Sequence, residues 1–216
     1  MDKFKIPIKE CGEELVEVEP AGFVAGRNYY HDGLTRNKKM YLRSGVVERL
    51  KKARQDLPKG YNFKVWDGYR PRQVQQKLWD KYYHQFKTEF SDWPEEKVVE
   101  RTDKYVARAE FSDRVPNHTT GGAVDLTIVD DKGEEIEMGT RFDEFKNETD
   151  SDYFENINLD NKTQIKIRDN RRLLKRVLEK QGFAQYKDEW WHFDYGNQAW
   201  AFDKNKEFAI YGAARI

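Results

Sequence analysis

Residues 118–129 read HTTGGAVDLTIV, and this stretch shows most clearly how the chain folds. From Gly122 onward the side chains alternate with the period of two that is typical of a β-strand. One face of this strand is purely apolar and carries Val124, Leu126 and Ile128. The opposite, exposed face carries Asp125 between two small residues. We therefore expect one face to join the core and the other to be available for chemistry.

Segments on both sides of this strand alternate between helical and strand periodicity. Helices are predicted at residues 44–57, 71–90, 94–110 and 168–181, and further strands at 61–66, 183–186 and 190–195. Residues 143–160 contain seven acidic side chains and a single lysine, which is typical of a long surface loop or lid. The pattern predicts an α+β fold in which residues 1–216 form one domain. Its small, mainly antiparallel sheet is flanked by helices, and a metal site lies on the open face of the sheet.

The composition limits the possible partners of the chain. Its 216 residues include 39 Lys plus Arg and 39 Asp plus Glu, so its formal net charge is zero. No overall field attracts nucleic acid or an anionic membrane. No signal-peptide core and no apolar run of about 18–20 residues is found, so we expect a cytoplasmic protein. Cys11 is the single cysteine and cannot form an intramolecular disulfide.

Two of the four histidines lie in unusual surroundings. His118 is followed seven residues later by Asp125, and His192 is preceded three residues earlier by Glu189. Two imidazoles and one carboxylate are a typical ligand set for one catalytic zinc ion, and a further carboxylate would be its general base. We therefore select His118, Asp125 and His192 as metal ligands and Glu189 as the base. Taken singly, each has an ordinary alternative role as a loop, strand-end or aromatic-cluster residue.

The spacing between Glu189 and His192 adds a geometric condition. Residues three apart on a regular strand point to opposite faces, so both side chains could not reach one metal ion from an extended segment. We therefore predict a bend or bulge at residues 188–190.

Together these motifs resemble those of the D-alanyl-D-alanine dipeptidases, zinc peptidases of the vancomycin-resistance type. HTTGGAVDLTI followed by EWWHF matches their pattern of His, six residues, Asp and then Glu-x-x-His. WDGYRP at 66–71, MGTRFDEF at 138–145 and, more loosely, GFVAGRNYY extend the resemblance across residues 23–195. It implies the same zinc ligands and base, with Arg70 stabilising the oxyanion and Asp143 binding the substrate's amino terminus. Without the resemblance, Arg70 would be read as a structural turn arginine and Asp143 as a solvated acid.

Two features depart from the family pattern. Pro116 stands where the family has a serine that helps to hold the substrate, and proline has no donor. The acidic segment 143–160 is a further elaboration that could change which peptides enter. The expected reaction is the hydrolysis of a small dipeptide, and D-Ala-D-Ala is the first candidate substrate. Cleavage of peptidoglycan stem peptides, as by a D,D-carboxypeptidase or endopeptidase, and a non-catalytic zinc or peptide-binding domain are the alternatives, and the oligomeric state is left open.

Overall fold

A five-stranded sheet forms the centre of the computed structural model, which describes residues 3–109, 115–144 and 146–216. Its strand order is β2-β4-β5-β7-β6, and only the β2–β4 pair is parallel. The strands are β2 (Val24–Ala25), β4 (Asn62–Asp67), β5 (Ala123–Val129), β6 (Ala184–Gln185) and β7 (His192–Asp194). β1 (Leu15–Glu17) and β3 (Tyr41–Arg43) form a separate antiparallel pair. The predicted α+β fold with a mainly antiparallel sheet is thus confirmed.

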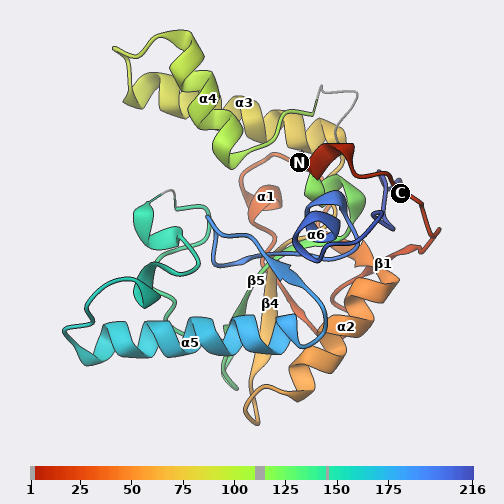
Figure 1. Cartoon of the computed structure of the whole chain (residues 1–216), viewed down its shortest axis with the longest axis vertical. Coiled ribbons are helices and arrows are strands. Elements are labelled where there is room, and N and C mark those ends of the chain that lie inside the picture. The colour runs from red at the N-terminus through yellow and green to blue at the C-terminus, as the bar shows by residue number, and fades with distance from the viewer. Residues whose placement is uncertain (1–2, 110–114, 145) are drawn as a thin grey trace.

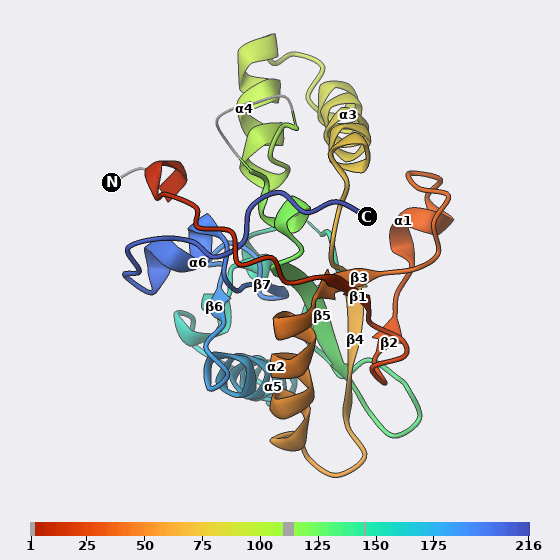
Figure 2. The same cartoon turned by 90° about the vertical axis from the view of Figure 1, so that its right-hand side faces the viewer.

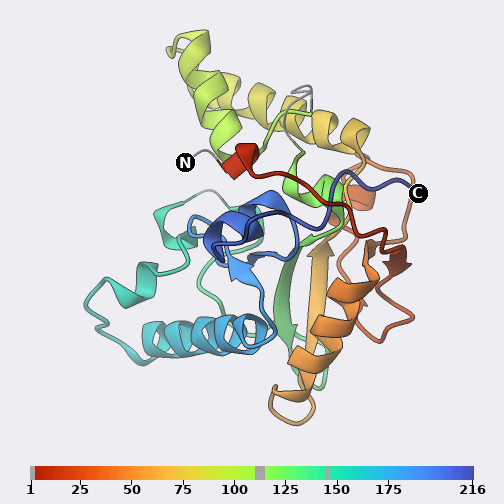
Figure 3. The same cartoon turned by 45° about the vertical axis from the view of Figure 1, so that its right-hand side comes forward.

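Helices pack around this sheet, as Figures 1 and 3 show. The described α-helices are α1 (Asn28–His31), α2 (Ser44–Gln55), α3 (Arg72–Glu89), α4 (Glu95–Tyr105), α5 (Lys162–Glu179) and α6 (Gln198–Asp203). Short 3-10 helices are η1 (Lys3–Lys5), η2 (Asn117–Thr120), η3 (Asn147–Thr149) and η4 (Tyr153–Glu155). The apolar stripes of α2 and α5 share one buried cluster with Val124, Leu126 and Ile128 of β5. No described helix is both long enough and apolar enough to cross a membrane.

The second face of β5 is buried as well, contrary to the expectation of an exposed face. All seven residues of the strand are buried, and Asp125 is only 3% exposed. Thr127 on this face borders a hollow that Trp66 and Trp190 also line. Alternation along a strand predicts which side chains share a face, but it does not reveal what covers that face.

Helices α3 and α4 form an arm that projects from the body of the molecule (Figures 1 and 2). They pack on each other through their own apolar cluster, which includes Leu78, Tyr82 and Phe86 of α3 and Val98 of α4. These α3 residues, spaced four apart, therefore belong to a core of the arm. The segment after α4 returns from this arm toward the sheet, where it borders the site described below.

The acidic segment lies at the surface, as predicted, and its described part contains two short 3-10 helices. Thr149 of η3 and Phe154 of η4 are buried, whereas the other described residues of 143–160 are exposed or partly buried. Buried Arg171 of α5 donates hydrogen bonds to the carbonyl oxygens of Met138, Glu148 and Asp150 at 2.8, 2.7 and 3.0 Å. The prediction of a surface loop is therefore confirmed, and a guanidinium on a neighbouring helix satisfies part of its backbone.

Helix α5 begins at Lys162, six residues before its predicted start at 168. The Asn161 side chain caps it by accepting a hydrogen bond from the backbone N–H of Gln164 at 2.9 Å. Its first five residues, at 162–166, are exposed or only partly buried. They therefore show no apolar periodicity, and the cap was the only local signal of the true start.

Candidate metal centre

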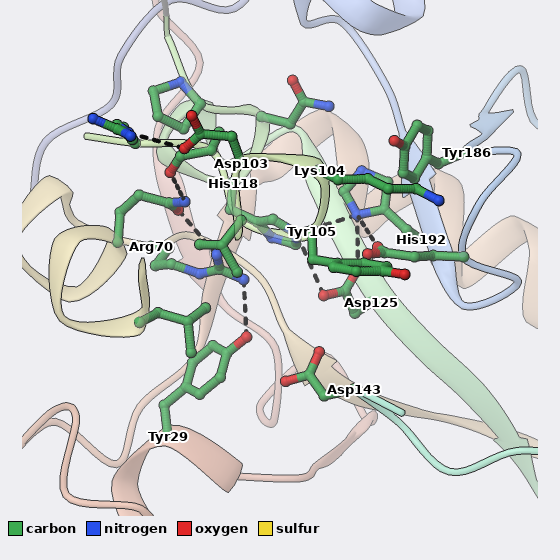
Figure 4. A pocket seen from close by; sticks show the side chains of 18 of the residues that line it. Tyr29, Arg70, Asp103, Lys104, Tyr105, His118, Asp125, Asp143, Tyr186 and His192 are labelled. Atoms are coloured by element: carbon green, nitrogen blue, oxygen red, sulfur yellow. Dashed lines mark hydrogen bonds and ion pairs between the residues drawn. The ribbon is translucent and has the colours of Figure 1, made fainter. Parts of the chain in front are cut away.

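Three buried side chains meet at one point from separate elements (Figure 4). His118 lies in η2, while Asp125 of β5 and His192 of β7 are direct cross-strand partners. His192 Nδ1 lies 2.9 Å from Asp125 Oδ1, and His118 Nε2 lies 3.3 Å from both Asp125 Oδ2 and His192 Nδ1. One potential ligand atom of each residue falls within 4.8 Å of the others. The structure thus brings together the three predicted ligand residues.

Two glycines connect His118 to the strand that carries Asp125. Gly121 ends η2 with φ 70°, a conformation that favours glycine. A Cβ atom at Gly122 would lie 2.3 Å from the carbonyl oxygen of Tyr195, so a side chain there would push β5 and the residues after β7 apart. These glycines place His118 beside the first residues of β5.

Each imidazole uses its other nitrogen to contact an acceptor. His118 Nδ1 lies 2.9 Å from the carbonyl oxygen of Gly68, and His192 Nε2 lies 3.2 Å from Asp194 Oδ1. Such contacts select the tautomer that leaves the remaining nitrogen free to bind a metal. Sequence reasoning missed Asp194, although its i,i+2 relation to His192 on one strand puts both side chains on the same face.

The charges of this cluster favour a cation at its centre. Burial opposes ionisation of Asp125, yet His118 and His192 outweigh it and lower the pKa of its carboxyl. Burial likewise disfavours the charged imidazolium of His192, but Asp194 and Asp125 raise its pKa well above the usual value. Two neutral imidazoles and one carboxylate form a fitting set for Zn²⁺. The residues present therefore fit a zinc ion.

Glu189 reaches this cluster because the chain bends before β7. The backbone N–H of His192 donates to the carbonyl oxygen of Glu189 at 3.2 Å, which closes a turn. The predicted bend is thus confirmed, and Glu189 Oε2 lies 3.9 Å from His192 Nδ1. Burial raises the pKa of the Glu189 carboxyl to about 8; nearby Asp125 and Asp143 raise it too, whereas His192 and Arg70 lower it. The structure places this carboxylate beside the three ligand residues.

Arg70 is buried at the edge of the same cavity, where side chains hold its guanidinium. It donates to Asp67 through Nε at 3.0 Å, to Gln75 at 2.9 Å and to the Tyr29 hydroxyl at 2.9 Å (Figure 4). Burial alone would lower the pKa of Arg70, but the Asp67 carboxylate raises it above the usual range. These partners are side chains, so the alternative in which Arg70 satisfies backbone carbonyls is not what the structure shows.

Asp143 lies on the side of Asp125 away from His192 (Figure 4) and is partly buried. Its backbone adopts φ 57°, a left-handed conformation that is uncommon for residues other than glycine. Burial raises the pKa of its carboxyl to about 7, as do Asp125 and Asp67, whereas Arg70 and a hydrogen bond with Tyr82 lower it. Asp143 therefore borders the site and is not a fully solvated loop acid.

A cavity of about 290 Å³ is lined by the three potential ligands and by Glu189, Arg70 and Asp143. Its lining also includes residues 103–108 at the end of α4, together with Lys3 and Phe4 of η1. Pro116 also borders the cavity. The sequence did not predict these lining residues, because no local spacing shows that residues 3–4 and 103–108 line the same cavity as the proposed zinc ligands.

A mixed sheet that supports two imidazoles, a carboxylate ligand and a neighbouring buried carboxylate has the design of a zinc metallopeptidase. The family model described as D-ala-D-ala dipeptidase matches residues 31–210. The chain belongs to this family, and the resemblance inferred from its motifs is confirmed.

Curated relatives support the same membership. A D-alanyl-D-alanine dipeptidase of Synechocystis sp. is 30% identical over 220 residues, which cover 93% of this chain and 89% of that protein. One from Enterococcus faecium is 34% identical over 153 residues, or 68% of this chain and 69% of its own length.

Solved structures give a more distant likeness. A variant of the vancomycin-resistance D,D-pentapeptidase VanY in complex with Zn(II) is 16% identical, with a TM-score of 0.45 over 77% of this chain and 81% of its own. VanYB in complex with D-alanine-D-alanine is 16% identical, with a TM-score of 0.47 over 77% and 80% of the two chains.

Proposed function

We propose that this chain is a zinc-dependent dipeptidase that hydrolyses D-alanyl-D-alanine. In this proposal His118, Asp125 and His192 hold one zinc ion, and Glu189 is the general base. The observation that supports it most is that Glu189 Oε2 lies 3.9 Å from a ligand nitrogen of His192, inside the cavity that all four side chains share. Membership of the dipeptidase family supports the choice of substrate.

The reaction requires a proton carrier beside the attacking water. When bound, zinc supplies Lewis-acid chemistry: it polarises the scissile carbonyl and lowers the pKa of water toward about 7. Glu189 accepts a proton from the water that attacks the peptide carbonyl carbon. The same carboxyl then donates this proton to the leaving amine as the C–N bond breaks.

Arg70 is proposed to stabilise the negative charge that develops on the carbonyl oxygen. Asp67, Gln75 and Tyr29 already fix its guanidinium, so little reorganisation is needed when the charge appears. The guanidinium remains positively charged at every working pH.

Asp143 is proposed to bind the ammonium group of the substrate. It lies on the opposite side of Asp125 from His192 (Figure 4) and lines the same cavity as the three proposed ligands. The cavity of about 290 Å³ is at the lower end of the range of about 300–1,000 Å³ that is usual for ligand pockets, so it suits a small peptide.

The test is an assay of the purified, zinc-loaded protein on D-Ala-D-Ala, L-Ala-L-Ala, N-acetyl-D-Ala-D-Ala and a stem pentapeptide. We expect turnover of free D-Ala-D-Ala and little of the acetylated form. Preferred cleavage of the pentapeptide would instead identify a carboxypeptidase or endopeptidase, and zinc binding without turnover of any peptide would identify a binding domain. The cytoplasmic location stays a prediction, which cell fractionation tests.

Glu189→Gln separates the base from the ligands. We expect zinc content to remain near that of the parent while kcat falls by at least about 10²–10⁴-fold, the usual contribution of a general base. His118→Ala should instead lose zinc as measured by elemental analysis. A Glu189→Gln protein that keeps the parent kcat would refute the assignment of the base.

A further inference from the structure

Two lysines line the cavity that contains the metal cluster, and they come from segments far apart in the sequence. Lys3 belongs to η1 and Lys104 to the last turn of α4. The arginines of the cavity are already paired, Arg70 with Asp67 and Arg108 with Asp103. Within residues 3–109, 115–144 and 146–216, neither lysine forms an ion pair. These are therefore the positive charges that the cavity has available for a ligand.

Both lysines lie close to aromatic rings of the cavity wall. Lys3 Nζ is 5.8 Å from the ring centre of Tyr186, and Lys104 Nζ is 5.4 Å from that of Tyr105. A cation within about 6 Å of an aromatic ring is attracted to it. Since both rings line the cavity, this attraction favours positions of the ammonium groups at the cavity.

The segments that carry these lysines are anchored by hydrogen bonds. Buried Gln198 donates from Nε2 to the carbonyl oxygens of Phe4 and Ile6 at 2.9 and 2.7 Å, which fixes η1. Buried Gln75 donates to the carbonyl oxygen of Ala107 at 2.6 Å, just beyond Lys104. The two backbone positions are thus set by the fold, although the lysine side chains reach solvent.

The charges of the cavity lie on two sides of the metal cluster. Figure 4 shows Lys104 beside His192 and Tyr186, whereas Asp143 lies beyond Asp125 on the other side. A free dipeptide is a zwitterion, with an ammonium group at one end and a carboxylate at the other. A substrate whose ammonium group is at Asp143 and whose peptide bond is at the metal cluster directs its carboxylate toward the lysines. Pro116 offers no side-chain donor for that carboxylate.

We infer that Lys3 and Lys104 form the subsite that binds the C-terminal carboxylate of the dipeptide. This inference rests on the proposed function and adds the recognition of the second charge. The two lysines would supply the contact to a free carboxylate that Pro116, which lines the same cavity, has no side-chain donor to make. Together with Asp143, the two lysines would restrict the substrate to peptides with both ends free and close together.

Binding can be measured apart from turnover in the zinc-loaded Glu189→Gln protein. Its affinity for D-Ala-D-Ala and for D-Ala-D-Ala amide, which lacks the carboxylate charge, is determined by calorimetry. Lys104→Gln should weaken binding of D-Ala-D-Ala about fivefold, the upper range for an exposed ion pair, and Lys3→Gln with Lys104→Gln should weaken it further. Binding of the amide should not change, and Lys104→Arg should restore the parent affinity.

The matched control is Lys52→Gln on α2, an exposed lysine that does not line the cavity. It should leave both affinities unchanged. An equal loss for the dipeptide and its amide, or no loss for either, would overturn the carboxylate subsite, as would a failure to bind D-Ala-D-Ala at all. Charge-dependent binding by a protein whose parent form hydrolyses neither compound would support the subsite and reject the proposed dipeptidase activity instead.

Discussion

Replacing Asp194 with asparagine tests how much a residue that does not itself bind the metal contributes to zinc affinity. Asp194 is 1% exposed and its Oδ1 lies 3.2 Å from His192 Nε2. Its carboxylate also accepts hydrogen bonds from Asn197 at 2.5 Å and from Asn117 at 3.1 Å. Asparagine keeps the shape and one acceptor oxygen but removes the negative charge that makes the imidazole a stronger ligand. The change therefore acts on the metal site with little effect on packing.

The expected loss of zinc affinity is about 10- to 100-fold, or roughly 1.4–2.8 kcal/mol, the usual effect of removing an acceptor behind a ligating histidine. Complete burial of Asp194 favours the upper half of this range, because water cannot replace the lost charge. Zinc affinity is measured by competition with a chromophoric chelator. Asp203→Asn on nearby α6, where the carboxylate is exposed, is the control and should bind zinc like the parent. An Asp194→Asn protein with parental zinc affinity would show that the backbone alone orients His192.

Two further predictions concern protons and stability. Asp194 and Asp125 raise the pKa of His192 in the metal-free chain, which favours its protonated form, and zinc competes with that proton. Zinc binding should therefore release protons and strengthen as pH rises, and calorimetric heats that do not depend on the ionisation enthalpy of the buffer would contradict this. Arg171→Met should lower the free energy of unfolding by about 3 kcal/mol, because one buried and two part-buried carbonyls lose their donor. Urea unfolding measures this loss, and an equal effect of Arg172→Met, which removes an exposed ion pair with Glu155, would argue against it.

Local patterns in the sequence were sufficient to predict those parts of the site that are formed by a single segment of the chain. The period-two alternation of β5 predicted that Asp125 and the apolar residues lie on opposite faces, because strand geometry is set residue by residue. The bend before His192 followed from spacing alone, since an extended segment could not direct Glu189 and His192 to one point. Asp194 could have been found by the same argument from its position two residues after His192.

Other parts depend on contacts between distant segments and were beyond such reasoning. Asp125 and His192 lie opposite each other on two neighbouring strands, and no local pattern predicts this register. The part of the cavity lined by residues 3–4 and 103–108 depends on where η1 and the end of α4 lie relative to the sheet. The anchoring of the acidic surface segment depends on Arg171, whose partners lie 21–33 residues away. Composition predicted its place at the surface but not this anchor.

The turn that follows β4 has a consequence for how this enzyme family can change. Within four residues, Asp67 binds the Arg70 guanidinium, the Gly68 carbonyl contacts His118, and the Arg70 backbone N–H donates to the His118 carbonyl at 3.1 Å. A Cβ atom at Gly68 would lie 2.5 Å from the carbonyl oxygen of Tyr41, so this path of the chain requires glycine. The spacing between the proposed metal and the proposed oxyanion donor is therefore not independently adjustable. We expect natural variation to alter which peptides enter long before it alters this spacing.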